Sequence, residues 1–551
     1  MIKRIKAYIS LSLIAASFSI LMLGLTYNIG FPWEEFGVLF KWKNEATWTG
    51  VGFNGGNEEI NWAKIRDDSG NVFLQLTYGI KPLEVFLYTI PPRLFGTNLF
   101  KHNFYRAVIF GLLLFILLLF VYKYTGSFLL CFISSIFLTT APQIWYAVVA
   151  KGSLKINSLF FVAAALYFFQ AYVDQPVDRK WNKNFFVPVL IVCFALLAIF
   201  LEQLGRYIFP IILFYLVITS PKKILKHWLL LTIFLFISIP IIGIFYKVLF
   251  NHSYNIFGLH SWGMRHYGVD PTNFKQCFGL FIKNYKNMIL YLNPIIFLTI
   301  FPISLYVIFL KLKMVFFKKS YPISNVMLWN NYLYMLAWLI ISLVIVFYIR
   351  GGWQYTILDN YQFDLSVILV PYVIVFALSL KIIKNLIKNY KLRNILIILI
   401  VFASFLFNVR ELNRYIGGIG GYIVSWDNVR RFAEEKAGNQ SETLLLVSDR
   451  TMLACFKPNL KVDQIENRYL FNANAFKKAC RERGYTKKYE TIFVVADNND
   501  ISAFEKDKEF KLLASLPCYN NSLYDKLKWL FKKPSPVRMY IYQYHFGKEN
   551  G

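Results

Sequence analysis

Long apolar segments separated by short basic clusters dominate this chain. A helix that crosses a membrane needs roughly 20 mostly apolar residues, because each residue advances it by about 1.5 Å through a hydrocarbon core about 30 Å thick. Eleven segments approach or exceed this length: 7–27, 105–122, 127–147, 156–173, 185–201, 205–219, 228–249, 291–310, 327–348, 364–380 and 394–409. The pattern predicts a multi-pass α-helical membrane protein with about eleven transmembrane helices.

Composition agrees with this prediction and excludes other classes of protein. The chain is 57% hydrophobic and 17% charged, whereas a soluble domain is about 45–50% apolar and about 25% charged. A single soluble domain and a disordered chain are therefore excluded. The net charge of +29 lies in clusters between apolar segments and not on a basic soluble face, so we expect no nucleic-acid partner.

The basic clusters also predict a topology. They occupy nearly every second connection, at Lys123 and within 179–183, 222–226, 311–319 and 381–393. Lys and Arg accumulate in cytoplasmic loops, so we expect a cytoplasmic N-terminus and an extracytoplasmic C-terminus. Segment 7–27 lacks a small-residue cleavage site and is predicted to be a retained helix, not a signal peptide. Abundant Lys, Ile, Asn, Phe and Tyr suit an AT-rich bacterial genome, and hence a bacterial inner (plasma) membrane.

After residue 410 the pattern changes to one typical of a small α/β domain. Apolar runs shorten to strand length at 443–448, 491–496, 510–515 and 537–544, and helical patterns lie between them at 426–437 and 473–483. We therefore divide the chain into a transmembrane region, 1–409, whose first external loop is 28–104, and an extracytoplasmic α/β domain, 410–551.

Cysteine spacing gives no site. Cys455, Cys480 and Cys518 lie in the predicted external domain and Cys277 in an external loop, but their spacing selects no disulfide pairing. No CxxC or HExxH motif is present, so the sequence carries no strong zinc signature.

Two adjacent carboxylates, Glu34 and Glu35, follow the outer end of the first predicted helix. One interpretation is a solvated acidic pair in the first turn of a short loop helix, where acidic residues are stabilising. The other is a general base or a metal ligand at the membrane surface, where a low dielectric raises the pKa of a carboxyl group.

Further short motifs follow this pair in a fixed order. They are YGIKPL at 78–83, RLFG at 93–96, YRA at 105–107, APQIWY at 141–146, AKG at 150–152 and FLEQLGR at 200–206. This ordered set resembles the membrane glycosyltransferases of the GT-C superfamily, and most closely the family 39-like group of protein O-mannosyltransferases and aminoarabinose transferases. The first carboxylate is commonly Asp in that group, whereas here it is Glu34.

The resemblance implies a GT-C-like fold and an inverting sugar transfer. The donor would be a sugar on a polyprenyl phosphate, and the acceptor a lipid, glycan or protein outside the cytoplasm. Glu34 would be the catalytic base, and Glu35 a second carboxylate that either orients the site or binds a divalent metal.

Cations at the outer ends of the spans are candidates for binding the donor phosphate, because arginine above all suits phosphate groups. They are Lys81, Arg106, Lys151, Arg206 and Arg265, with Lys155 and Arg350 as further possibilities. Candidates for binding other parts of the substrate are Glu202, His266 and Tyr355. For each cation the competing interpretation is interfacial snorkelling, and for Glu202 and Arg206 it is a structural pair at helical spacing.

Two other functions fit parts of the pattern. A binder or transporter of lipid-linked glycans would also place cations at outer span ends, but few ionisable residues lie deep in the spans and no internal repeat is present. An O-antigen polymerase or ligase would concentrate Arg and His in a late external loop, which segment 250–290 matches in part.

Overall fold

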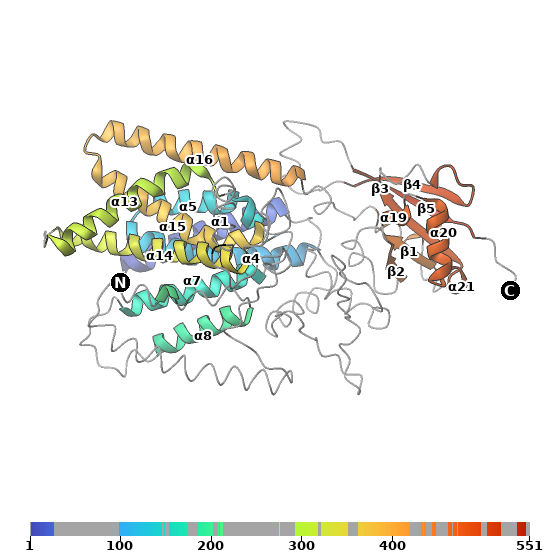
Figure 1. Ribbon diagram of the computed structural model, residues 1–551, viewed down its shortest axis with the longest axis horizontal. Coiled ribbons are helices and arrows are strands. Elements are labelled where there is room, and N and C mark those ends of the chain that lie inside the picture. The colour runs from blue at the N-terminus through green and yellow to red at the C-terminus, as the bar shows by residue number, and fades with distance from the viewer. Residues whose placement is uncertain are drawn as a thin grey trace.

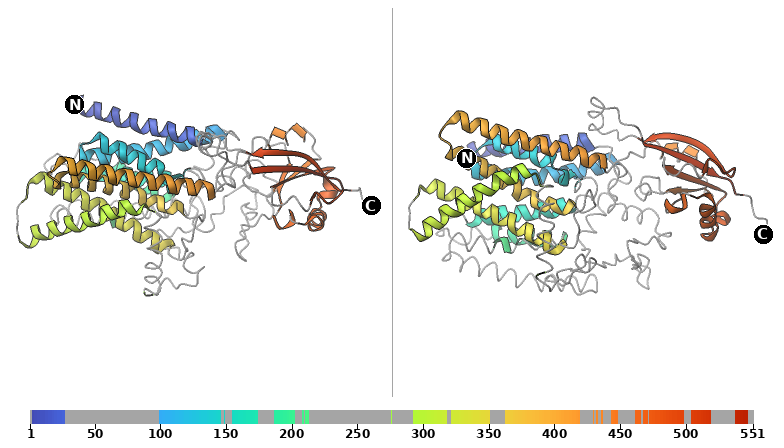
Figure 2. Two further views of the ribbon diagram at one scale, coloured as in Figure 1. Left: turned by 90° about the horizontal axis from the view of Figure 1, so that it is seen from above. Right: turned by 45° about the horizontal axis from the view of Figure 1, so that its top comes forward.

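The protein forms a bundle of long helices, and a small sheet lies beyond one end of it (Figures 1 and 2). The computed structural model describes residues 2–26, 99–145, 154–173, 186–201, 292–317, 321–350, 362–418, 443–447, 461–465, 467–470, 472–497, 504–518 and 537–546, with some isolated positions between them.

Helices occupy nine of the eleven segments predicted to span the membrane. They are α1 (Ile2–Thr26), α4 (Leu99–Thr125), α5 (Phe128–Thr140), α6 (Pro142–Trp145), α7 (Leu154–Val173), α8 (Phe186–Leu201), α13 (Pro294–Phe316), α14 (Ile323–Arg350), α15 (Gln362–Leu386) and α16 (Tyr390–Gly418). Six of the described helices, namely α1, α4, α13, α14, α15 and α16, are long and apolar enough to cross a membrane. Segments 205–219 and 228–249 lie outside the described residues, apart from a few positions in the first, so the total of eleven stays a prediction.

The segment 127–147, predicted as one span, is broken into α5 and α6. Pro142 has no amide hydrogen to donate, and its ring pushes the preceding residue out of the helical conformation. Ala141 accordingly has φ −70° and ψ 122°. α5 alone is about 20 Å long at 1.5 Å per residue, which is too short to cross the hydrocarbon core.

α15 forms the centre of the bundle, and α16 lies at its margin. Every residue of α15 from Val367 to Leu380 is buried, whereas apolar side chains of the outer helices are open to the surroundings. Ile398 of α16 is 64% exposed and Leu298 of α13 is 68% exposed, each among several exposed Leu, Ile and Phe side chains. Soluble proteins rarely expose apolar patches larger than a few hundred Å², so these helices face lipid and the chain is an integral membrane protein.

Basic residues gather at one end of the described bundle. This end holds the start of α1 (Figure 1), the ends of α4, α13 and α15, and the start of α16, with Lys3, Arg4, Lys6, Lys123, Lys311, Lys313, Lys381, Lys384, Lys391 and Arg393. No Asp or Glu occurs in the described helices at this end. The sheet lies beyond the opposite end (Figure 2).

The C-terminal region contains a five-stranded mixed sheet in the order β2-β1-β3-β5-β4. The strands are β1 (Thr443–Val447), β2 (Lys461–Gln464), β3 (Thr491–Asp497), β4 (Phe510–Cys518) and β5 (Val537–Tyr544). β2, β1 and β3 are parallel, and β5 pairs antiparallel with both β3 and β4. The four strands expected from the sequence are present, while β2 and the antiparallel half of the sheet were not expected. The predicted boundary at 409/410 falls within α16, and the division into two domains stays a prediction.

Helix α20 (Ala473–Glu482) packs on one face of this sheet. Its Phe476 and Cys480 contact a core that includes Leu444, Ile492 and Val494. The strand residues that point to the other face, such as Leu445 and Val495, are buried too. Burial on both faces explains why β1 and β3 are almost continuously apolar, as parallel strands usually are.

Candidate functional site

Arg106 is the one predicted site residue whose side chain lies in the described part of the chain. The others lie outside it: Glu34, Glu35, Lys81, Lys151, Glu202, Arg206, Arg265, His266 and Tyr355. The side chains of Lys155 and Arg350 lie outside it as well. How these residues are arranged around Arg106 therefore stays a prediction.

Arg106 is buried in α4, with 2% of its surface exposed. Its Nη1 donates a hydrogen bond to Oδ1 of Asn103, 2.8 Å away and one helical turn earlier. Nδ2 of Asn103 in turn donates to the backbone carbonyl of Thr26, the last residue of α1, over 2.8 Å. The guanidinium is thus tied through Asn103 to the end of α1.

A close approach between α1 and α4 sets this arrangement. Oγ of Ser19 donates to the backbone carbonyl of Ala107 over 2.6 Å. Gly111 lies opposite Ser19, and a Cβ added to this glycine would come within 3.0 Å of both Cβ and Oγ of the serine. Even alanine at position 111 would therefore require Ser19 to move by a few tenths of an ångström.

The position of Arg106 suits it for binding an anion near the membrane surface. It lies seven residues into α4, or about 10 Å along the helix axis, and α4 begins at the end of the bundle opposite the chain's N-terminus (Figure 1). An ionisable residue inside an apolar span is costly and is a functional candidate by default. The chain leaves α1 at this end and reaches Glu34 eight residues after Thr26.

A second polar cluster at the same end was not expected from the sequence. Asn293, the N-cap of α13, accepts hydrogen bonds at Oδ1 from the amides of Ile295 and Ile296 over 3.2 and 3.4 Å. Its Nδ2 donates to the carbonyl of Ser404 over 2.8 Å and to Oδ1 of Asn408 over 2.9 Å. Both asparagines are buried.

The cluster extends to the helix break at Ala141. Nδ2 of Asn408 donates to the carbonyl of Phe137 and to Oγ1 of Thr140, each over 3.3 Å. The hydroxyl of Tyr372 on α15 donates to the carbonyl of Asn293 over 2.8 Å. We call Asn293, Asn408 and their partners Ser404, Thr140 and Tyr372 the asparagine junction. The Asn-Pro pair that starts α13 and the Asn at position 408, near the end of the apolar segment 394–409, were its signals in the sequence.

A third buried polar contact lies among α13, α14 and α15. The hydroxyl groups of Tyr332 and Ser304 are 2.9 Å apart, and those of Tyr332 and Ser379 are 3.2 Å apart. It resembles the asparagine junction in burial, but it joins helix interiors and not helix ends.

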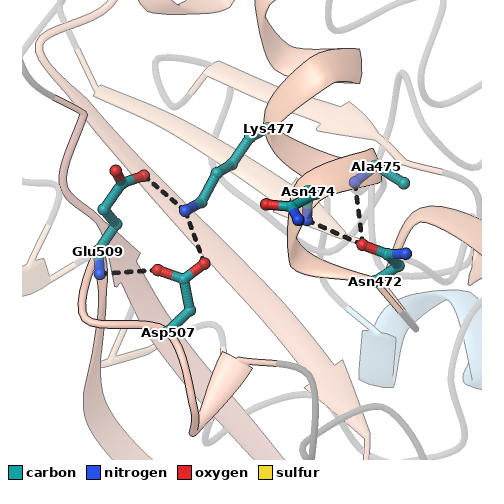
Figure 3. A network of polar contacts seen from close by, with 6 residues as sticks. All are labelled: Asn472, Asn474, Ala475, Lys477, Asp507 and Glu509. Atoms are coloured by element: carbon teal, nitrogen blue, oxygen red, sulfur yellow. Dashed lines mark hydrogen bonds and ion pairs between the residues drawn. The ribbon is translucent and has the colours of Figure 1, made fainter.

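In the sheet region, Lys477 of α20 joins two carboxylates near the start of β4 (Figure 3). Its Nζ lies 2.6 Å from Oδ2 of Asp507 and 2.8 Å from Oε2 of Glu509. The backbone amide of Glu509 also donates to Oδ1 of Asp507. Desolvation disfavours the charged forms of Lys477 and Asp507, but the hydrogen bonds and opposite charges between them outweigh this effect. The pKa of Lys477 is therefore raised and the pKa of Asp507 is lowered. The cluster holds the helix to the sheet.

Within the described residues, no three His, Cys, Asp or Glu side chains are placed to hold a metal ion together. Glu34 and Glu35 lie outside that part, so a divalent metal stays a prediction. Cys131, Cys193 and Cys480 are free thiols.

Comparison with known proteins gives no family. No protein-family model matches the sequence, and no curated protein matches it. Among solved structures, the archaeal oligosaccharyltransferase AglB from Archaeoglobus fulgidus, in complex with an inhibitory peptide and a dolichol-phosphate, is similar at 12% identity and a TM-score of 0.47, over 88% of this chain and 69% of AglB.

Two further structures are similar at the same level. The arabinofuranosyltransferase AftD from Mycobacteria has 10% identity and a TM-score of 0.46, over 98% of this chain and 40% of AftD. ArnT from Cupriavidus metallidurans has 11% identity and a TM-score of 0.44, over 98% of both chains. At such values these similarities establish neither a family nor an activity for this chain.

Proposed function

We propose that this protein is an inverting membrane glycosyltransferase of the GT-C type, related to the family 39-like group. It moves a hexosyl or pentosyl sugar from a polyprenyl-phosphate donor to a lipid, glycan or protein acceptor outside the cytoplasm. The observation that carries the proposal is the burial of Arg106 beside the end of α1, because the chain continues from that end to the Glu34-Glu35 pair. The order of the short motifs along the sequence supports it.

In the proposed reaction, the carboxylate of Glu34 takes the proton of the acceptor hydroxyl group. The acceptor oxygen then attacks the anomeric carbon of the sugar, and the bond between this carbon and the phosphate oxygen breaks. Polyprenyl phosphate leaves with the bonding electron pair. Arg106 contributes by stabilising the charge that develops on the phosphate, where a guanidinium can donate two parallel hydrogen bonds.

The proposed orientation places Arg106 and the sheet on the extracytoplasmic side of a bacterial inner membrane. The basic end of the described bundle carries the chain's N-terminus, and the sheet lies beyond the other end (Figure 1), which fits the enrichment of Lys and Arg in cytoplasmic connections. On this orientation the sheet is an acceptor-binding or structural cap over the outer ends of the helices.

Transfer of radiolabelled sugar from a panel of polyprenyl-phosphate sugars tests the proposal. Membranes with the wild-type chain, with Glu34→Gln and with Glu58→Gln, a matched control in the same external loop, are compared. We expect label to reach lipid, glycan or protein with the wild type and the control, and not with Glu34→Gln. Transfer by Glu34→Gln would remove Glu34 as the base.

The wild-type result also separates the alternative functions. Donor binding without transfer by a well-folded wild-type protein would overturn the proposal in favour of a lipid-linked glycan binder or transporter. Growth of a glycan polymer that depends on Arg265 but not on Glu34 would favour an O-antigen polymerase or ligase.

A further inference from the structure

We infer that the asparagine junction is a positioning element of the proposed donor site. It joins, at one buried point, the helix ends next to two segments that carry predicted phosphate-binding residues. The inference rests on the proposed function and adds residues to it that the sequence motifs do not include.

The junction is directional, because each of its two amides donates at Nδ2 and accepts at Oδ1. In Asn293, Oδ1 accepts two backbone N–H groups and Nδ2 donates to two oxygens; in Asn408, Oδ1 accepts from Asn293 and Nδ2 donates to two oxygens. A carboxylate in place of either amide could only accept hydrogen bonds, so the contacts made by Nδ2 would be lost. Leucine could make none of these hydrogen bonds. Few other side chains can therefore hold α5, α13 and α16 in this relation.

Backbone strain at Asn293 indicates that the surroundings impose this geometry. Its φ of 72° and ψ of 94° lie in a region that residues with a side chain rarely adopt. Among the described residues it is the one non-glycine residue with a positive φ. Strained conformations persist where many contacts determine them, and they gather at functional sites.

The junction lies beside both predicted phosphate-binding segments along the chain. Asn293 follows segment 250–290, which contains Arg265 and His266, and Thr140 precedes the break that leads through α6 towards Lys151. Nε1 of Trp145 at the end of α6 also donates to the carbonyl of Thr139, over 2.7 Å. α13 begins and α5 ends at the end of the bundle where α4, which carries Arg106, begins (Figure 1). The junction thus anchors one end of each segment at the level of the proposed donor phosphate.

Equilibrium binding of a short-chain polyprenyl phosphate to the full-length protein in detergent tests this role. The variant is Asn408→Leu, and the matched control is Tyr332→Phe, which removes a hydroxyl from the equally buried contact with Ser304 and Ser379. Thr140→Val, which removes a single partner of Asn408, is a milder second variant in case Asn408→Leu does not fold. Thermal midpoints are measured for all of them.

We expect Asn408→Leu to weaken polyprenyl-phosphate binding by at least tenfold and Thr140→Val to weaken it less. Tyr332→Phe should lower the thermal midpoint but bind like the wild type. Wild-type binding by a folded Asn408→Leu or Thr140→Val variant, with active wild-type protein, would overturn the positioning role alone. Equal loss of binding in Tyr332→Phe would also overturn it, because the junction would then act only through stability. Wild-type protein that neither binds polyprenyl phosphate nor transfers sugar would overturn the proposed function together with this inference.

Discussion

Nη1 of Arg106 and Oδ1 of Asn103 lie 2.8 Å apart, and the amide nitrogen of the same asparagine reaches the last residue of α1. Asn103 therefore works in two directions: it orients a buried cation in α4 and it holds the end of α1. A side chain that did only one of these things would lose either the hydrogen bond to the guanidinium or the hydrogen bond to the end of α1.

Replacement of Arg106 should reduce sugar transfer. We expect Arg106→Gln to lower kcat by roughly 10²- to 10³-fold, as is common when a donor to a developing negative charge is removed. Arg106→Lys should fall between Arg106→Gln and the wild type, because an ammonium keeps the charge but loses the bidentate geometry. Initial rates at saturating donor concentration provide the measurement.

The control for Arg106 is Arg410→Gln on α16, whose side chain is 76% exposed. This variant should keep wild-type rates. A normal rate in Arg106→Gln would mean that the buried arginine has a structural role only, whatever the outcome for Glu34.

Alanine and glycine at position 293 should differ in stability. Both substitutions remove the four side-chain hydrogen bonds of Asn293, but alanine must also adopt the positive φ of 72°, which costs an L-residue about 1–2 kcal/mol. Asn293→Gly should therefore have the higher thermal midpoint in detergent. The same pair at Ile398, an exposed position inside α16, should show the opposite order, because glycine in a helix costs about 1 kcal/mol relative to alanine. A more stable Asn293→Ala would contradict the observed backbone conformation.

The Lys477 cluster should stabilise the sheet over a defined pH range. The pKa of Asp507 is lowered from its ordinary value of 3.8. Its contribution to the free energy of unfolding is therefore present above pH 3.8 and is lost as the pH falls through the lowered pKa. The pKa of Lys477 is raised from 10.5. Its contribution to the free energy of unfolding is therefore present below pH 10.5 and is lost as the pH rises through the raised pKa. Lys477→Met should reduce protection from hydrogen exchange in α20 and β4 at neutral pH, and the difference from the wild type should shrink in acid.

Lys478→Met is the control for that cluster. Lys478 lies on the same helix and pairs with Glu482 over 3.8 Å, but its side chain is 77% exposed, and such surface pairs contribute about 0–1 kcal/mol. In Lys478→Met, the hydrogen-exchange protection factors of α20 and β4, corrected for the intrinsic pH dependence of exchange, should match those of the wild type. An equal effect of the two lysine variants would argue against a specific role for the contacts of Lys477 with Asp507 and Glu509.

Cys480 should be inert in the folded protein. Burial raises the pKa of its thiol to about 12, although nearby Arg483 opposes part of the rise, whereas an unperturbed cysteine titrates near 8.5. The thiolate is the reactive form, so at pH 8 we expect alkylation at least about 10³-fold slower in native than in denatured protein. Mass spectrometry of the peptide with Cys480 measures this, and rapid labelling of native protein would show that the thiol is not enclosed between α20 and the sheet.

Several features were predictable because they depend on local composition. The positions of α1, α4, α7, α8, α13, α14, α15 and α16 followed from runs of apolar residues, since a helix in lipid must satisfy its own backbone hydrogen bonds. The strands β1, β3, β4 and β5 followed from short apolar runs between turn residues. The break at Ala141 was missed because hydropathy averages over Pro142, although the proline itself was visible.

The candidate site was predictable only in part. Arg106 stands out in the sequence as a cation at the outer end of an apolar segment, and its burial agrees with a specific role. Asn103 does not stand out, because a polar residue near a helix start is ordinary; its importance comes from the carbonyl of Thr26, which is distant in the sequence.

The sequence by itself determined that this chain is a membrane protein with helices of a given length, a charge asymmetry between their ends and a region of short strands after them. These properties are sums over neighbouring residues. Only the tertiary structure decided that Asn293 meets Asn408, that α15 is the central helix, and that β5 inserts antiparallel between β3 and β4. Each depends on which distant segments pack together, and a hydrogen bond specifies such a pairing only when both partners are buried away from competing water.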